Sequence, residues 1–128
     1  MKVVIILFSC LVTSLITSSC YAASSVKPVL HLDELNIKNF GFSYCLTKSK
    51  DSLLSSEASL AMGGYFQRGN YEEPAYGNLK KYVDHYIKGA NDVYQSTDKP
   101  AILMNCLDMY NSVEYKGLIE QQKKYLIK

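Results

Sequence analysis

Cys45, Cys106, His31 and His85 are the residues with which this chain could carry out nucleophilic catalysis. A Cys–His enzyme needs a thiolate, a base within hydrogen-bond reach of it and a third group that orients the base. His31 lies near the start of the chain, and we expect His85 at an exposed position on a helix. Cys106 falls on the apolar face of a predicted helix, where burial raises the pKa of a thiol and makes it unreactive. We therefore expect no catalytic residue.

The spacing of the other polar residues does not favour metal or carboxylate chemistry. Two cysteines and two scattered histidines lack the spacing of a zinc site, so we expect no metal ligand and no cofactor. The carboxylate pairs Asp33-Glu34 and Glu72-Glu73 lie at the starts of predicted helices, where negative charge is favoured. Adjacent residues on a helix point apart, although two carboxylates from different segments could still meet for glycoside hydrolysis. The sequence leaves that alternative open.

Residues 1–22 have the pattern of a secretory signal peptide. Lys2 is followed by an apolar run and by small residues that end at Ala22, after which we expect cleavage. The apolar core at residues 3–16 is short for a membrane span, which needs about 20 apolar residues. Lipidation at Cys20 is an alternative, but the residues before this cysteine match that pattern poorly. We expect a periplasmic protein with no membrane span in the mature chain.

Export decides which cysteines remain in the mature protein. Cys10 and Cys20 leave with the signal peptide, so Cys45 and Cys106 enter an oxidising compartment and most simply form one disulfide. The bond would close a loop of about 60 residues, which loop-closure entropy makes worth roughly 4 kcal/mol. This is a large fraction of a typical net stability of about 5–15 kcal/mol.

Apolar residues recur at steps of three and four along the chain, and no run alternates with period two. This pattern predicts an all-α fold, a small bundle of about five helices. We expect a flexible leader at residues 23–32 and a single helical domain at residues 33–128. The first helix is apolar on two sides, which favours a central position, and Gly41 within it would permit a close contact between helices. The predicted starts of the five helices are Asp33, Asp51, Glu72, the segment Asp98-Lys99-Pro100, and Ser112.

The composition favours a protein-binding role over nucleic-acid binding. The net charge is +2 with both signs mixed along the chain, whereas nucleic-acid binding needs a clustered basic face. The chain has eleven tyrosines and no tryptophan, and Tyr71 and Tyr94 fall in predicted connections. Tyrosine is enriched at protein interfaces because it combines a large rigid ring with a polar group. A small periplasmic hydrolase that uses Cys106 or a carboxylate, and a periplasmic adaptor or chaperone, are the alternatives.

The segment NCLDMYNSVEY, from Asn105 to Tyr115, resembles the C-terminal signature of the type VI secretion amidase immunity proteins, which protect against the fourth class of secreted amidase effectors. In that family a late helix carries Cys-Ile/Leu-Asp-Met-Tyr. A short break with Ser follows, and Glu and an apolar residue then open the last helix. Two further features agree with the family layout, namely the signal peptide and the aromatic residues that precede Cys45. Tyr115 stands where Leu is more usual, and we expect it at the edge of the core. The matching residues are Cys106, Leu107, Asp108, Met109, Tyr110, Ser112 and Glu114.

The resemblance implies a small, periplasmic, all-helical and usually homodimeric protein without catalytic activity. It also implies a partner, a cognate peptidoglycan amidase of the NlpC/P60-like cysteine class, whose active-site cleft is entered by a loop between late helices. A polar loop with one aromatic anchor can plug a cleft when a rigid scaffold limits the entropy lost on binding. An ordinary helix connection is the alternative for this segment. The corresponding residues here are Asn91, Asp92, Val93, Tyr94, Gln95 and Ser96.

Overall fold

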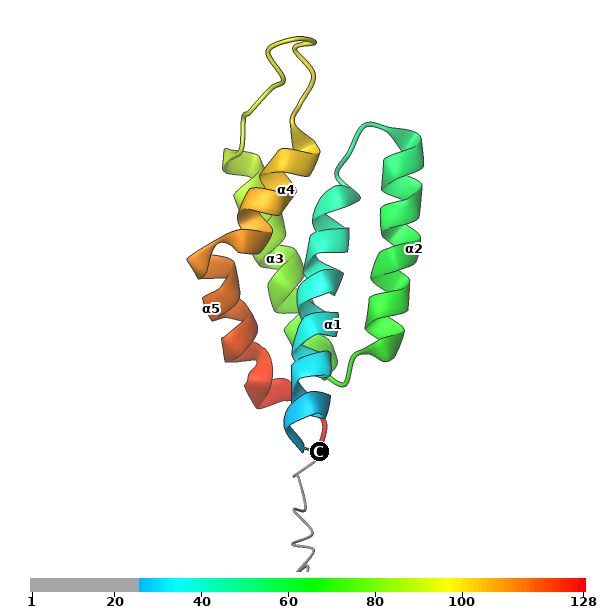
Figure 1. Ribbon diagram of the computed structural model, residues 1–128, viewed down its shortest axis with the longest axis vertical. Helices are drawn as coiled ribbons and strands as arrows, with labels where there is room; N and C mark the ends of the chain where they lie inside the picture. Colours follow the sequence, from blue (N-terminus) through cyan, green and yellow to red (C-terminus); the bar gives the residue numbers. More distant parts are fainter. Residues whose placement is uncertain (1–25) are drawn as a thin grey trace, which may run out of the picture.

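A computed structural model of the protein describes residues 26–128, and the signal peptide predicted at residues 1–22 lies outside them. Five α-helices and one 3-10 helix account for most of the described chain (Figure 1). They are α1 (Val26–Leu46), α2 (Ser52–Arg68), α3 (Glu73–Gly89), α4 (Ile102–Asn111), α5 (Val113–Gln121) and η1 (Gln122–Tyr125). The predicted all-α fold with five helices and one disulfide is confirmed. None of the helices in residues 26–128 has the length and apolar content required to cross a membrane.

α1 lies at the centre of the bundle, as predicted, and α2, α3, α4 and α5 all pack against it (Figure 1). Because it is covered on several sides, α1 supplies core residues from more than one face. α2 is more peripheral, since Ala58 is its only buried residue. The buried apolar cluster consists of Ile37, Phe40, Cys45, Tyr71, Ala75, Tyr76, Leu79, Val83, Cys106, Met109, Tyr115 and Ile119.

The contact between α1 and α5 depends on Gly41. The Tyr115 side chain is 0 % exposed, and its hydroxyl donates a 2.7 Å hydrogen bond to the Lys38 carbonyl oxygen. A Cβ atom at Gly41 would overlap this hydroxyl and lie 3.1 Å from Leu79 Cδ2, so the predicted close contact at Gly41 is confirmed. The expectation that Tyr115 lies at the edge of the core is wrong. Tyrosine is accommodated in the interior because a backbone acceptor satisfies its buried hydroxyl, and burial raises the pKa of that hydroxyl.

Side-chain caps start two of the helices where the sequence predicts them. Asp51 Oδ1 accepts a 2.8 Å hydrogen bond from the Leu54 N–H at the start of α2. Ser112 Oγ accepts a 3.1 Å hydrogen bond from the Tyr115 N–H at the start of α5. Such caps satisfy N–H groups that have no partner within the helix.

The ends of the fold differ from the sequence-based expectation. α1 begins at Val26, so residues 26–32 of the predicted flexible leader are helical. Pro28 is compatible with this because it falls in the first turn, where backbone N–H groups have no intrahelical partner. At the other end, α5 stops at Gln121, and the 3-10 helix η1 continues the chain to Tyr125. The boundaries of the domain itself stay a prediction.

Candidate functional site

Residues 90–101 protrude from one end of the bundle, between α3 and α4 (Figure 1). We call this segment the loop. The side chains of residues 91–100 are all exposed, and the C-terminus lies at the opposite end of the molecule. The loop contains residues 91–96, for which the resemblance implies contact with a partner.

Backbone hydrogen bonds fold the loop into a small hairpin. The Tyr94 N–H donates to the Lys99 carbonyl oxygen at 2.9 Å, and the Ala101 N–H donates to the Asp92 carbonyl oxygen at 2.8 Å. These bonds join the outgoing and the returning arm of the loop. The backbone is therefore ordered by its own contacts, although its side chains are exposed.

The predicted start of the fourth helix at Asp98-Lys99-Pro100 is wrong. Pro100 forms an antiparallel bridge with Val93, and Asp98 has a φ of 54° in the turn between the two arms. α4 begins only at Ile102, and the residue before it makes no side-chain cap hydrogen bond. The physical reason is that the hairpin uses the backbone groups of this segment, so they do not open a helix.

The outgoing arm of the loop combines apolar and polar side chains. Val93 is 51 % exposed and Tyr94 is 37 % exposed. Tyrosine gives a large contact area with few rotatable bonds, and it is one of the residues that dominate binding energy at interfaces. The polar side chains around these two residues are those of Asn91, Asp92, Gln95 and Ser96.

The predicted disulfide fastens the α4 side of the loop to α1. Cys45 and Cys106 are bonded, with their Cα atoms 5.8 Å apart, and both side chains are 0 % exposed. Because Cys106 lies in the second turn of α4, the bond holds the helix that directly follows the loop. A bonded sulfur has no thiolate, so this structure excludes a hydrolase with Cys106 as its nucleophile.

A polar cluster fastens the α3 side of the loop to α1. Lys48 Nζ, just beyond the end of α1, lies 2.7 Å from Asp84 Oδ1 on α3. The Tyr44 hydroxyl of α1 donates to the same carboxylate at 3.1 Å. The hydrogen bond from Lys48 is the main cause of an Asp84 pKa below its ordinary value, and the Tyr44 hydrogen bond acts in the same direction. Both helices that flank the loop are therefore attached to α1.

The segment with the family signature has mainly structural contacts. Cys106 and Met109 are buried, and the Tyr110 hydroxyl donates a 3.0 Å hydrogen bond to Asn39 Oδ1 on α1. Ser112 caps α5 and separates it from α4. These contacts position α4 relative to α1 and α5. Of the residues that match the family signature, Leu107, Asp108 and Glu114 are exposed.

The sequence matches the family described as type VI secretion system (T6SS), amidase immunity protein (Tai4), over residues 35–119. The match covers more than half of the chain and includes both bonded cysteines, the loop and the signature. The chain belongs to this family. No curated protein matches the sequence significantly.

Family membership makes this immunity protein an inhibitor and not an enzyme. Its potentially reactive residues are consistent with that class. His31 and His85 are exposed, and the two sulfurs that a histidine could have activated are bonded to each other. Among residues 26–128, no group of three or more His, Cys, Asp or Glu side chains is arranged to hold a metal ion.

Sequence reasoning missed the returning arm of the immunity protein's loop. This arm adds Lys99 and Pro100 to the exposed surface beside Val93 and Tyr94. A usable signal was present, because a β-branched and an aromatic residue stand between two turn-forming segments, which is a hairpin pattern. The composition of Asp98-Lys99-Pro100 equally fits a helix start, so the sequence alone does not distinguish the two.

Proposed function

We propose that this immunity protein acts in the periplasm, where it binds and inhibits a cognate type VI peptidoglycan amidase of the NlpC/P60-like cysteine class. Residues 91–96 enter the active-site cleft of the amidase and block access of the peptide crosslink. The observation that carries the proposal is the protruding hairpin, whose backbone extends beyond the helices (Figure 1). The side chains of residues 91–100 are all exposed.

Order in the free loop supports inhibition by insertion. Immobilising a side chain on binding costs about 0.5–1.5 kcal/mol, and ordering a flexible backbone adds to that cost. The two hydrogen bonds between the arms, from Tyr94 to Lys99 and from Ala101 to Asp92, order the backbone in advance. The attachments of α3 and α4 to α1 keep the base of the hairpin in place. Most of the binding energy of Tyr94 would then appear as affinity.

Three features support action outside the cytoplasm. Residues 1–22 have the pattern of a signal peptide. The Cys45–Cys106 disulfide is typical of proteins in an oxidising compartment. The substrate of a peptidoglycan amidase is part of the cell wall, so inhibition is needed there. The resemblance also leads us to propose a homodimer, and light scattering on the purified protein measures its state directly.

The proposal is tested with the mature protein and a panel of purified type VI peptidoglycan amidases, by following peptidoglycan digestion. We expect the wild-type protein to stop digestion by one of them. Tyr94→Ala and Asp92→Ala should each weaken this inhibition, by about tenfold or more for Tyr94, because truncation of an interface hot spot costs at least about 1–2 kcal/mol. The helical content should not change, because both side chains are exposed.

Val93→Ala and Val113→Ala give a matched pair for the same assay. Both remove an exposed valine side chain, but Val113 lies on α5 and Val93 in the loop. We expect weaker inhibition only for Val93→Ala. If all loop variants inhibit as well as the wild type, the contact surface lies elsewhere. If the wild-type protein inhibits none of the amidases, the proposed function is wrong.

A further inference from the structure

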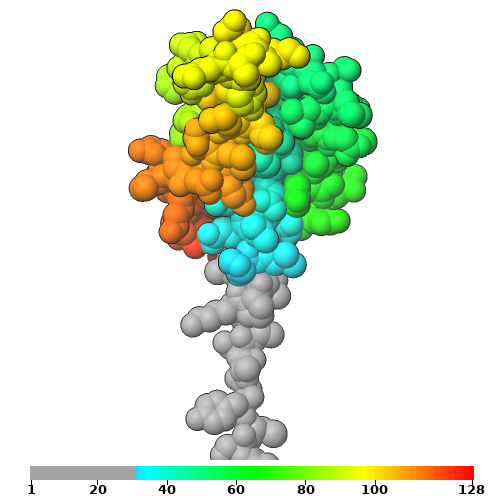
Figure 2. Space-filling view, turned by 45° about the horizontal axis from the view of Figure 1, so that its top comes forward, coloured from blue at the N-terminus to red at the C-terminus, as the bar shows by residue number. Residues whose placement is uncertain are grey.

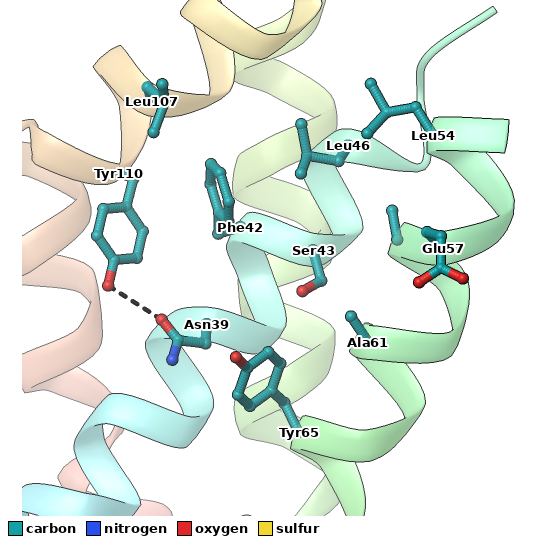
Figure 3. Close-up of a pocket in the computed structure, with 11 residues that line it drawn as sticks. Asn39, Phe42, Ser43, Leu46, Leu54, Glu57, Ala61, Tyr65, Leu107 and Tyr110 are labelled. Carbon is teal, nitrogen blue, oxygen red and sulfur yellow. Dashed lines mark hydrogen bonds between the residues drawn. The ribbon is translucent and has the colours of Figure 1, made fainter. Parts of the chain in front are cut away.

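A groove runs along α1 between α2 and α4 (Figure 3). α1 forms its floor, and α2 and α4, which both pack on α1, form its walls. Its volume is about 470 Å³, within the range of about 300–1,000 Å³ that is typical of ligand pockets. The floor consists of Asn39, Phe42, Ser43 and Leu46, and the walls of Leu54, Glu57, Ala58, Ala61 and Tyr65 from α2 and Leu107 and Tyr110 from α4.

The groove is apolar except for one charge and a few neutral polar groups. Glu57 is the only charged residue that lines it, and its carboxylate forms no ion pair or hydrogen bond with the side chains of residues 31–128. The Tyr110 hydroxyl already donates to Asn39 Oδ1, so this pair belongs to the fold. An occupant that complements the groove has apolar side chains with a basic residue next to them.

The surface of the loop continues into this groove. α4 starts directly after the loop, and its first two turns expose Leu103, Met104 and Leu107. Leu103 and Leu107 are four residues apart and share one face of the helix, and Leu107 is also part of the groove wall. In Figure 2 the loop (yellow) and α4 (orange) form one continuous stretch of surface, with α1 (cyan) visible between α4 and α2 (green). A partner placed on the loop is therefore next to the groove.

The loop alone is too small for a stable complex. Specific protein interfaces bury about 800 Å² per partner and involve about 20–30 residues on each side, which is more than residues 90–101 can provide. The remaining contact area must come from a neighbouring surface. Apolar side chains at the core of an interface contribute most when they fill pockets. The exposed leucines of α4 supply further contact area next to the loop, and the groove behind them is a pocket that apolar side chains of a partner can fill.

We propose that the amidase bound by the loop also fills the groove between α2 and α4, with apolar side chains and a Lys or Arg that pairs with Glu57. This inference rests on the proposed function, because it takes the inhibited amidase as the occupant. The loop then blocks the active site, and the groove adds affinity and selects among amidases by the charge and shape of a second segment.

The test uses the amidase that the wild-type protein inhibits, inactivated at its catalytic cysteine, and measures the dissociation constant by interferometry. Ala61→Trp fills the groove from an exposed position on α2, and Glu57→Lys reverses its charge. We expect each to weaken binding at least tenfold. Ser56→Trp, which places the same side chain on α2 outside the groove, should bind like the wild type. Thermal melting confirms that every variant is folded.

The charge of the occupant is tested separately with Glu57→Gln. We expect binding several-fold weaker than wild type at low salt, and a smaller difference at high salt because ions screen the paired charges. Equal binding by Glu57→Gln and the wild type at low salt would overturn the assignment of a basic residue.

The outcomes separate this inference from the proposed function. If Tyr94→Ala weakens binding while Ala61→Trp and Glu57→Lys do not, the groove proposal is wrong and the proposed function stands. If Ala61→Trp leaves the affinity unchanged but splits a homodimer in light scattering, a second copy of the chain occupies the groove, and the proposal is again wrong. If the wild-type protein inhibits no amidase, both fail together.

Discussion

The two attachments that hold the base of the loop to α1 differ in chemical kind. On the α4 side, the Cys45–Cys106 bond is covalent and fully buried, so neither pH nor salt acts on it. On the α3 side, Lys48 and Asp84 form a partly exposed ion pair, which water and salt screen. We therefore expect the loop to depend mainly on the disulfide, which is nearest to its returning arm, and less on the polar cluster.

Removal of the disulfide should have the largest effect on the stability of the protein. Cys45→Ser opens a covalent ring with a sequence separation of 61 residues, and we expect a loss of about 2–5 kcal/mol in the free energy of unfolding. Denaturant unfolding of the oxidised wild type and of the variant measures it. The double variant Cys45→Ala/Cys106→Ala should show a similar loss, which separates the bond from the effect of a buried hydroxyl. Unchanged unfolding midpoints would mean that the covalent attachment does not govern stability.

Gly41→Ala tests how closely α1, to which both attachments connect, packs against Tyr115 of α5. The new methyl group would overlap the Tyr115 hydroxyl, which costs about 1–3 kcal/mol, and the better helix propensity of Ala returns about 1 kcal/mol. We expect a net loss of stability in denaturant unfolding. Gly117→Ala on α5 is the control, since a Cβ atom there meets no neighbour within 4 Å, and it should be neutral or stabilising.

The double variant Gly41→Ala/Tyr115→Phe identifies the cause of that loss. Without the hydroxyl the closest overlap disappears, so the two changes together should cost less than the sum of the single changes. Strict additivity would show that the two residues do not interact, against the contact seen in the structure.

Asp84→Asn removes the negative charge of the polar cluster and should have the smallest effect on stability. At neutral pH we expect a loss below about 1 kcal/mol, because the ion pair is partly exposed. The folded-state pKa of Asp84 is depressed, so its contribution is present above its ordinary value of about 3.9 and is lost as the pH falls through the folded-state pKa. Denaturant unfolding measures the difference in free energy of unfolding between variant and wild type. This difference should be present at pH 7 and should shrink at successively lower pH values below 4. Asp108→Asn, which changes an exposed carboxylate without an ion pair among the described residues, is the control and should leave the free energy of unfolding at pH 7 unchanged.

The sequence was sufficient for the features that depend on local patterns. Cys45 and Cys106 lie on apolar stripes of two helices and are the only cysteines after the predicted signal peptide, so their pairing could be predicted. The position of the loop followed from a polar run after Gly89. Asp51 could be identified as a cap because capping requires only a short polar side chain before an apolar stripe.

The features that were missed depend on how distant segments meet. The interior position of Tyr115 requires a glycine on another helix and a free path to the Lys38 carbonyl, and periodicity contains no information on either. The hairpin form of the loop requires Pro100 to lie opposite Val93. The groove depends on the spacing of three helices, so its lining residues are scattered between Asn39 and Tyr110 in the sequence.

The ring closed by the disulfide has a consequence for proteolysis. Residues 91–100, which are all exposed, lie inside this ring, between Cys45 and Cys106. A protease that cuts once in the loop produces two fragments, each of which contains one of the bonded cysteines. The fragments stay joined, and they run as one band on a non-reducing gel and as two after reduction. A single cut in the loop thus opens its backbone without releasing any piece of the protein.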